Sequence, residues 1–167
     1  MKKCLFIGSI ILLLNSCDNF SNNEAQEVNL DKSVISEKSV KVDLNKLGYN
    51  LVVNVPDTVS KTLEINQNEM GVEIFVEKKF HVAIGYDGDM ALKKDDLEND
   101  GLFQNEILSE KGGFIIYKSK LPDGSKTFHH FYGVKESDGE SYELYDVSSD
   151  QPLSEKAVTR AVELLLK

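Results

Sequence analysis

The sequence is poor in the residue types that most often carry catalysis. It has no tryptophan, three histidines and two cysteines among its 167 residues. It also lacks a G-x-S-x-G nucleophile turn, a phosphate-binding loop, a G-x-G-x-x-G dinucleotide motif and an H-E-x-x-H zinc motif. These absences argue against the common hydrolases, nucleotide-dependent enzymes and zinc peptidases. The sequence gives no positive indication of an enzyme, and it predicts no cofactor.

Positive charge is also scarce. The chain has 19 lysines and arginines against 28 aspartates and glutamates, a formal net charge of −9 at pH 7. A surface of this sign repels the phosphates of nucleic acids and of anionic lipids, which bind proteins mainly through lysine and arginine. The balance therefore argues against a nucleic-acid partner. It suits simple solubility or a basic protein partner.

Long apolar runs are absent as well. The longest, Leu5–Leu14, has ten residues. As a helix it would be about 15 Å long, half of a hydrocarbon core of about 30 Å, so it is too short to span a membrane. Lys2 and Lys3 precede it and polar residues follow it. A positive start followed by a short apolar run is typical of a secretory signal peptide, which we predict over residues 1–16.

The apolar run ends in Leu14-Asn15-Ser16-Cys17. This stretch resembles the lipobox of bacterial lipoproteins, in which a leucine stands three residues before the cysteine and a small residue directly precedes it. Leu14, Ser16 and Cys17 match that pattern, whereas Asn15 stands where alanine, serine or threonine is more usual. The resemblance implies cleavage before Cys17 and attachment of acyl chains to it. The alternative is an ordinary secretory signal with an incidental cysteine.

Cleavage before Cys17 would change the cysteine content and the net charge of the mature chain. Cys4 would be lost and Cys17 would be the sole cysteine, which excludes intramolecular disulfides, cysteine metal sites and cysteine catalysis. The remaining chain would carry 17 basic and 28 acidic residues, a net charge of −11. Residues 17–40 are rich in polar residues and have no apolar period, so we predict a flexible tether there. A single globular domain is expected over residues 41–167.

Alternating apolar residues and turn-forming residues predict the first elements of this domain. A strand is expected over Tyr49–Val55, and one or two strands over Val72–Val76 and Lys79–Tyr86. Gln104–Ser109 is expected to form an edge strand. A helix is predicted over Met90–Leu97, because Asp89 can cap its first turn.

The clearest pattern lies near the C-terminus. The stretches Phe114–Leu121, Lys126–Glu136 and Ser141–Val147 alternate apolar and polar residues, and Asp123-Gly124 and Asp138-Gly139 separate them. Asp-Gly between such stretches is the strongest short-range indication of a hairpin, because both turn residues must accept a positive φ. The sequence therefore predicts a three-stranded antiparallel meander.

A last helix is predicted after the meander. Ser154 can cap it, and Leu153 can pack against Val158 as a hydrophobic staple. Its apolar residues recur at helical spacing and are expected to pack on the sheet: Val158, Ala161, Val162 and Leu165.

The order of these elements indicates an α+β fold: an antiparallel sheet of about five or six strands, packed by the C-terminal helix and one internal helix. The layout over residues 45–167 resembles that of the PsbP/Mog1-like group. In that group the domain begins with a strand ending in proline, as in "LVVNVP" here, and closes with a helix after a meander. The group is functionally diverse and mostly non-enzymatic, so the resemblance favours a binding role.

Two-residue loops in the meander would fix its register. His130 would lie between Tyr117 and Val147, and Tyr132 between Ile115 and Tyr145. One sheet face would then gather the following residues: Ile115, Tyr117, Phe128, His130, Tyr132, Val134, Tyr145 and Val147. Two interpretations are open for this face. It is either a core face under the C-terminal helix, with tyrosine hydroxyls at its rim, or a ligand pocket lined by Tyr117, His130, Tyr132 and Tyr145.

Two groups of residues could be taken for metal sites, but neither has the geometry that a metal ion needs. His129 and His130 are adjacent on a strand, so their side chains point to opposite faces and cannot readily bind one ion. The acidic residues between Asp87 and Asp100 do not fit an EF-hand loop, because Ala91 and Leu92 stand where an oxygen ligand and a glycine are needed. We predict a solvated acidic helix face and no metal.

Three functions are compatible with these observations. The first is a non-catalytic protein-binding or assembly module, anchored through Cys17 to a membrane of the bacterial cell envelope, with its domain on the periplasmic or surface side. The second is an immunity-type lipoprotein whose acidic surface neutralises a basic antibacterial toxin. The third is a small-ligand carrier or an enzyme that uses the tyrosine and histidine face.

Overall fold

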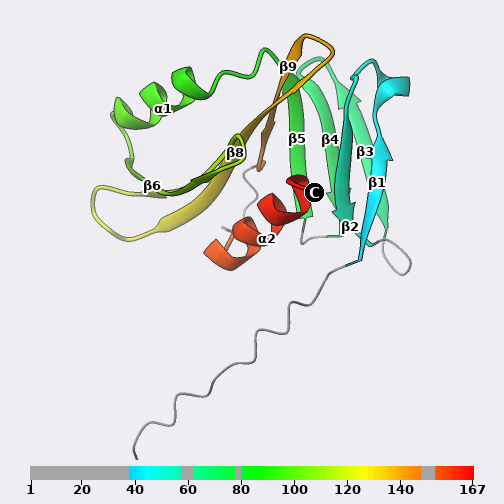
Figure 1. The fold of residues 1–167 in the computed structure, drawn as a ribbon. Helices are drawn as coiled ribbons and strands as arrows, with labels where there is room; N and C mark the ends of the chain where they lie inside the picture. The colour runs from blue at the N-terminus through cyan, green and yellow to red at the C-terminus, as the bar shows by residue number, and fades with distance from the viewer. Residues whose placement is uncertain (1–37, 58–61, 78–79, 148–152) are drawn as a thin grey trace, which may run out of the picture. The chain divides into compact units, whose positions relative to one another are not determined.

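The computed structural model describes residues 38–57, 62–77, 80–147 and 153–167 (Figure 1). Antiparallel strands and two α-helices make up this part of the chain, which confirms the α+β prediction. The elements are β1 (Ser39–Asp43), the 3-10 helix η1 (Asn45–Leu47), β2 (Val52–Pro56), β3 (Leu63–Asn68), β4 (Gly71–Val76), β5 (Phe80–Tyr86), α1 (Met90–Glu98), β6 (Gln104–Lys111), β7 (Phe114–Lys120), β8 (Thr127–Ser137), β9 (Glu140–Tyr145) and α2 (Glu155–Leu165).

Seven of the strands form one sheet in the order β3-β4-β5-β9-β8-β7-β6. Two meanders, β3 to β5 and β6 to β9, therefore meet where the last strand, β9, pairs with β5. Ala83 lies opposite Tyr145 at one end of this junction, and Tyr86 lies opposite Tyr142 at the other. The remaining strands, β1 and β2, form a separate antiparallel hairpin.

The described residues contain nine strands, more than the five or six expected. The sequence analysis placed no strand at β1 or at β3, and it left open whether β4 and β5 were one strand or two. In β3 the sequence Leu63–Asn68 has one half-buried residue followed by five exposed ones, because β3 is an edge strand of the sheet. An edge strand that buries so little has no strong alternation of apolar and polar residues, and it forms by pairing with β4.

The meander has the predicted register. Tyr117 lies opposite His130, and Tyr132 lies between Ile115 and Tyr145. The second turn has the predicted two residues, with φ of 52° at Asp138 and 82° at Gly139. The first turn is longer than predicted, since the Leu121 N–H bonds to the Lys126 carbonyl around four residues, but it keeps the same register. Val147 lies beyond the end of β9.

One face of the sheet carries the larger core. Both α2 and the β1–β2 hairpin pack on this face, and α2 contacts β2, β8 and β7. The cap of α2 is as predicted: the Ser154 hydroxyl accepts from the Ala157 N–H at 3.3 Å. The sheet residues buried here include Val72, Ile74, Val82, Ile84, Phe114, Ile116, Phe131, Tyr142 and Leu144.

The covering of the tyrosine and histidine face was predicted wrongly. The C-terminal helix does not cover it, because α2 packs on the opposite face, against Phe114, Ile116 and Phe131. The internal helix α1 covers it instead, and Leu97 of α1 packs with Ile115, Tyr117 and Tyr132. The physical reason is the chemistry of the two helices. The aliphatic stripe of α2 packs on a face made mainly of aliphatic residues and phenylalanines, whereas the Asp89 N–H at the start of α1 donates to the Tyr132 hydroxyl.

The two helices thus lie on opposite faces of the sheet, and α1 is the shorter of them (Figure 1). Its main contacts are with β8 and β6. The same face continues across β9, β5, β4 and β3, where no described helix makes comparable contacts. We call this part the open face and define it by the residues that the register places on it: Glu64, Glu73, Phe75, His81, Ala83, Glu143 and Tyr145.

Candidate functional site

The four residues proposed for a ligand pocket lie on one face of the sheet, but their side chains are not equally exposed. Tyr117 and Tyr132 are buried under α1, with 9% and 6% of their surfaces exposed. His130 and Tyr145 are half-buried, and Tyr145 packs at the edge of the same cluster. This geometry supports a core role for the two buried tyrosines.

Their surroundings also keep the two tyrosines in the protonated state. The Asp89 backbone N–H donates to the Tyr132 hydroxyl at 3.2 Å. Burial raises the pKa of Tyr132 to about 12 and raises the pKa of Tyr117 further. The Lys93 ammonium from α1 lies 5.4 Å and 5.6 Å from the two ring centres, a cation–π arrangement. The face therefore holds α1 on the sheet and offers no tyrosinate at neutral pH.

His130 has a partner that the sequence analysis missed. Its Nδ1 atom lies 2.7 Å from Oδ2 of Asp146, a carboxylate that is only 8% exposed as a residue. The other carboxylate oxygen accepts from the Phe131 backbone N–H at 2.8 Å. The ladder between β8 and β9 ends one residue earlier, at Tyr132 and Tyr145. The Asp146 side chain therefore satisfies an N–H group that the ladder leaves without a strand partner.

A second histidine on this side of the sheet has its own carboxylate. His81 Nε2 lies 3.1 Å from Oε2 of Glu73, and its ring stacks on Phe75 at a centroid distance of 3.7 Å. Burial lowers the pKa of His81, and this effect exceeds the raising effects of Glu73 and of the Asp146 charge. The fold therefore favours the neutral form of this ring.

The His81 environment makes stability depend on pH. In the unfolded chain His81 takes up a proton near pH 6.5, whereas the folded protein resists it to a lower pH. The unfolded state then binds more protons, so the free energy of unfolding falls as the pH drops below about 6.5. We expect His81→Gln to lose less stability than the native protein between pH 7 and pH 5, as measured by urea unfolding.

His129→Gln is the matched control for this prediction. His129 is also half-buried on a strand, but it lies opposite Lys118 and away from Glu73 and Phe75 in the sheet order. An equal loss of stability in the native protein and in His81→Gln would contradict the assignment to His81.

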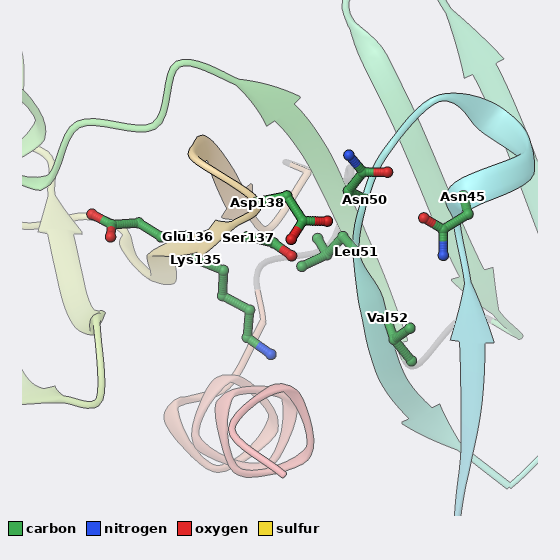
Figure 2. Close-up of a pocket in the computed structure, with 8 residues that line it drawn as sticks. All are labelled: Asn45, Asn50, Leu51, Val52, Lys135, Glu136, Ser137 and Asp138. Carbon is green, nitrogen blue, oxygen red and sulfur yellow. The ribbon is translucent and has the colours of Figure 1, made fainter.

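None of these aromatic residues lines the groove drawn in Figure 2. It has a volume of about 460 Å³, and two chain segments line it. One is Asn45 with Asn50–Val52, at η1 and the start of β2; the other is Lys135–Asp138, at the end of β8 and the turn to β9. The sequence analysis missed it, because nothing in the sequence indicated that η1 and the β8–β9 turn meet.

Tyrosine side chains fix the wall of the groove formed by η1 and β2. The Tyr142 hydroxyl of β9 accepts from the Asn50 backbone N–H at 3.1 Å and donates to Glu140. Tyr86 of β5 donates to the Gly48 carbonyl at 2.9 Å and stacks on Tyr49 at a centroid distance of 4.6 Å. The loop that carries Asn45 and Asn50 is thereby held to the two central strands of the sheet.

Neither a search for metal-binding and membrane-spanning features nor the comparisons with known proteins assigns a function to the chain. Among the described residues, no three histidine, cysteine, aspartate or glutamate side chains are grouped so as to hold a metal ion. No helix in that part of the chain is long and apolar enough to cross a membrane. No family model, no curated protein and no solved structure matches the chain. Residues 1–37, including the predicted lipidation site Cys17, lie outside the described residues.

Proposed function

We propose that the protein is a lipid-anchored binding protein of the bacterial cell envelope, which holds a partner at the membrane and does not catalyse a reaction. The observation that carries the anchor is Leu14-Asn15-Ser16-Cys17 at the end of a ten-residue apolar run. Acyl chains on Cys17 would each contribute about 0.8 kcal/mol per buried methylene group, and two or more chains are enough for stable anchoring.

The geometry of the aromatic face supports binding over catalysis. The two buried tyrosines hold the fold, since Tyr132 accepts from the start of α1 and both rings pack with Leu97. His130 is oriented by Asp146 through Nδ1, but among the described residues no hydroxyl or thiol hydrogen-bonds to its other ring nitrogen, so the pair has no nucleophile to activate. The interactions of this face are those of a packed and satisfied sheet surface.

The open face supports a protein partner and indicates its charge. The register places Glu64, Glu73 and Glu143 on it, with Phe75 and Tyr145 between them. No lysine or arginine of the four strands is placed on this face by the same register. Carboxylates around aromatic rings favour a basic surface, because lysine and arginine can pair with the former and stack on the latter.

The negative charge of the open face also favours a second candidate function. A basic antibacterial toxin would fit the open face, in which case the protein acts as its immunity partner. Binding to such a toxin that weakens steeply with salt separates this candidate from a general assembly role.

The anchor is tested by Cys17→Ser, which removes the only thiol that the predicted mature chain would carry. We expect complete loss of acyl labelling, because a serine hydroxyl cannot replace the thioether. We also expect the protein to appear as a soluble domain or as an uncleaved precursor. Metabolic labelling with a radioactive fatty acid, followed by membrane fractionation, measures both effects.

Cys4→Ser is the matched control. Cys4 lies within the predicted leader, on the other side of the predicted cleavage site from Cys17, so this variant is expected to be labelled and anchored like the native chain. Labelling of Cys17→Ser at the native level would overturn the lipoprotein assignment.

A further inference from the structure

We infer that the groove between η1 and the β8–β9 turn binds a zwitterionic peptide of about three residues, with its carboxylate at Lys135 and its ammonium at Asp138. This inference rests on the proposed binding role and names a ligand class for one site. The volume of about 460 Å³ lies in the range of small-ligand sites, which run from about 300 to 1,000 Å³.

Lys135 provides the first charge. Its register partner is Tyr142, so its side chain leaves β8 on the face that also carries α2. Figure 2 shows it extending along the groove toward α2. Burial lowers its pKa, and no carboxylate among the described residues lies within ion-pair distance of its ammonium. A half-buried cation without a counter-charge gains from binding an anion.

Asp138 provides the opposite charge. It is the first residue of the two-residue turn, with φ of 52°, and no described cation pairs with its carboxylate. Figure 2 shows its side chain beside Leu51 and Asn50, away from the Lys135 ammonium. The two charges therefore mark different ends of one groove.

The backbone spacing of the two residues limits the length of the ligand. Lys135 lies near the end of β8 and Asp138 lies in the turn that follows, so their Cα atoms are at most about 10 Å apart. An extended peptide of about three residues covers a similar distance between its two termini.

The lining between the charges suits a peptide backbone. Asn45, Asn50 and Ser137 bring amide and hydroxyl groups, which can donate to and accept from peptide groups. Val52 is 44% exposed and offers apolar contact to a side chain. A phosphate ester fits less well, because the groove holds one lysine and the negative charge of Asp138 opposes a dianion.

The test uses the full chain in detergent, with trialanine and two blocked forms of it as probes. Backbone-amide NMR spectra report both affinity and location. We expect trialanine to shift the amides of Lys135–Asp138 and of Asn50–Val52. Amidation of its C-terminus or acetylation of its N-terminus is expected to weaken binding about tenfold or more, the usual effect of losing a charged hydrogen bond.

Two variants assign each charge to its partner. Lys135→Met keeps the alkyl chain, and Asp138→Asn keeps a residue that tolerates a positive φ, so both are expected to fold. Lys135→Met should lose its preference for the free carboxylate but keep its preference for the free amine, and Asp138→Asn should show the reverse pattern. Glu98→Gln is the control, because Glu98 is an exposed acidic residue at the end of α1 and does not line the groove.

Three results would overturn the inference: blocked and free peptides that bind equally, shifts confined to other parts of the chain, or no shifts at millimolar peptide. None of these bears on Cys17, so the anchor and the groove fail or succeed separately. If Cys17→Ser is released from the membrane but the full chain binds no peptide, the proposal of a lipid anchor stands and only the peptide ligand is withdrawn.

Discussion

Gly133→Ala is expected to lower the free energy of unfolding by about 3 kcal/mol, the upper part of the usual range for overpacking a core. A Cβ atom at this position would lie 2.2 Å from two ring carbons of Phe114. The ring has no room to move, because Phe114 is 1% exposed and packs near Phe131 under α2. A domain of this size is commonly stable by about 5–15 kcal/mol, so the loss is a large fraction of the total.

Urea unfolding measures this effect, and Gly101→Ala is its control. No atom lies within 4 Å of a Cβ built on Gly101, so this substitution is expected to leave stability nearly unchanged. Phe114→Leu in the Gly133→Ala background should restore part of the loss, because the smaller side chain makes room for the new methyl group. A loss below about 0.5 kcal/mol in Gly133→Ala would contradict the packing described for this face.

Asp146→Ala is expected to have a similarly large effect, a loss of about 3 kcal/mol, because it removes a buried carboxylate with two hydrogen-bond partners and leaves the Phe131 N–H unsatisfied. The substitution leaves the Phe131 N–H and His130 Nδ1 without the carboxylate that lies 2.8 Å and 2.7 Å from them. Asp146→Asn should lose less, because its amide oxygen can still accept from the Phe131 N–H.

Hydrogen exchange adds a local measurement to the unfolding experiment. The Phe131 amide should exchange faster in Asp146→Ala than in Asp146→Asn, relative to other core amides of β8. The control is Asp123→Ala, since Asp123 also accepts from a backbone N–H, that of Ser125, but on the surface. If Asp146→Ala proved no more destabilising than Asp123→Ala, the bond network around Asp146 would not contribute as described.

Several parts of the fold could be predicted because local chemistry determines them. The Asp138-Gly139 turn fixed the register of β8 and β9, which places Tyr132 opposite Tyr145. Asp89 and Ser154 marked the starts of both helices, and both side chains accept backbone N–H groups there. Each of these features depends on residues within a few positions of one another in the sequence.

The features that could not be predicted depend on long-range packing. Two helices and two apolar sheet faces were foreseeable, but which helix covers which face depends on the whole chain. The role of Asp146 was hidden for a similar reason, since the register would place an acid opposite the core residue Phe131. That conflict between an acidic residue and a core position was the available indication that β9 ends before it.

The place of β9 in the sheet has a consequence for the order of folding. The meander β3–β5 and the meander β6–β9 can each form from neighbouring segments, but β5 meets its second neighbour only when residues near the C-terminus arrive. Closing this gap requires a long loop, which is slow compared with forming a hairpin. The meander β3–β5 is therefore expected to form first, with one edge of β5 unpaired. The core is completed only after the residues of β9 have been synthesised.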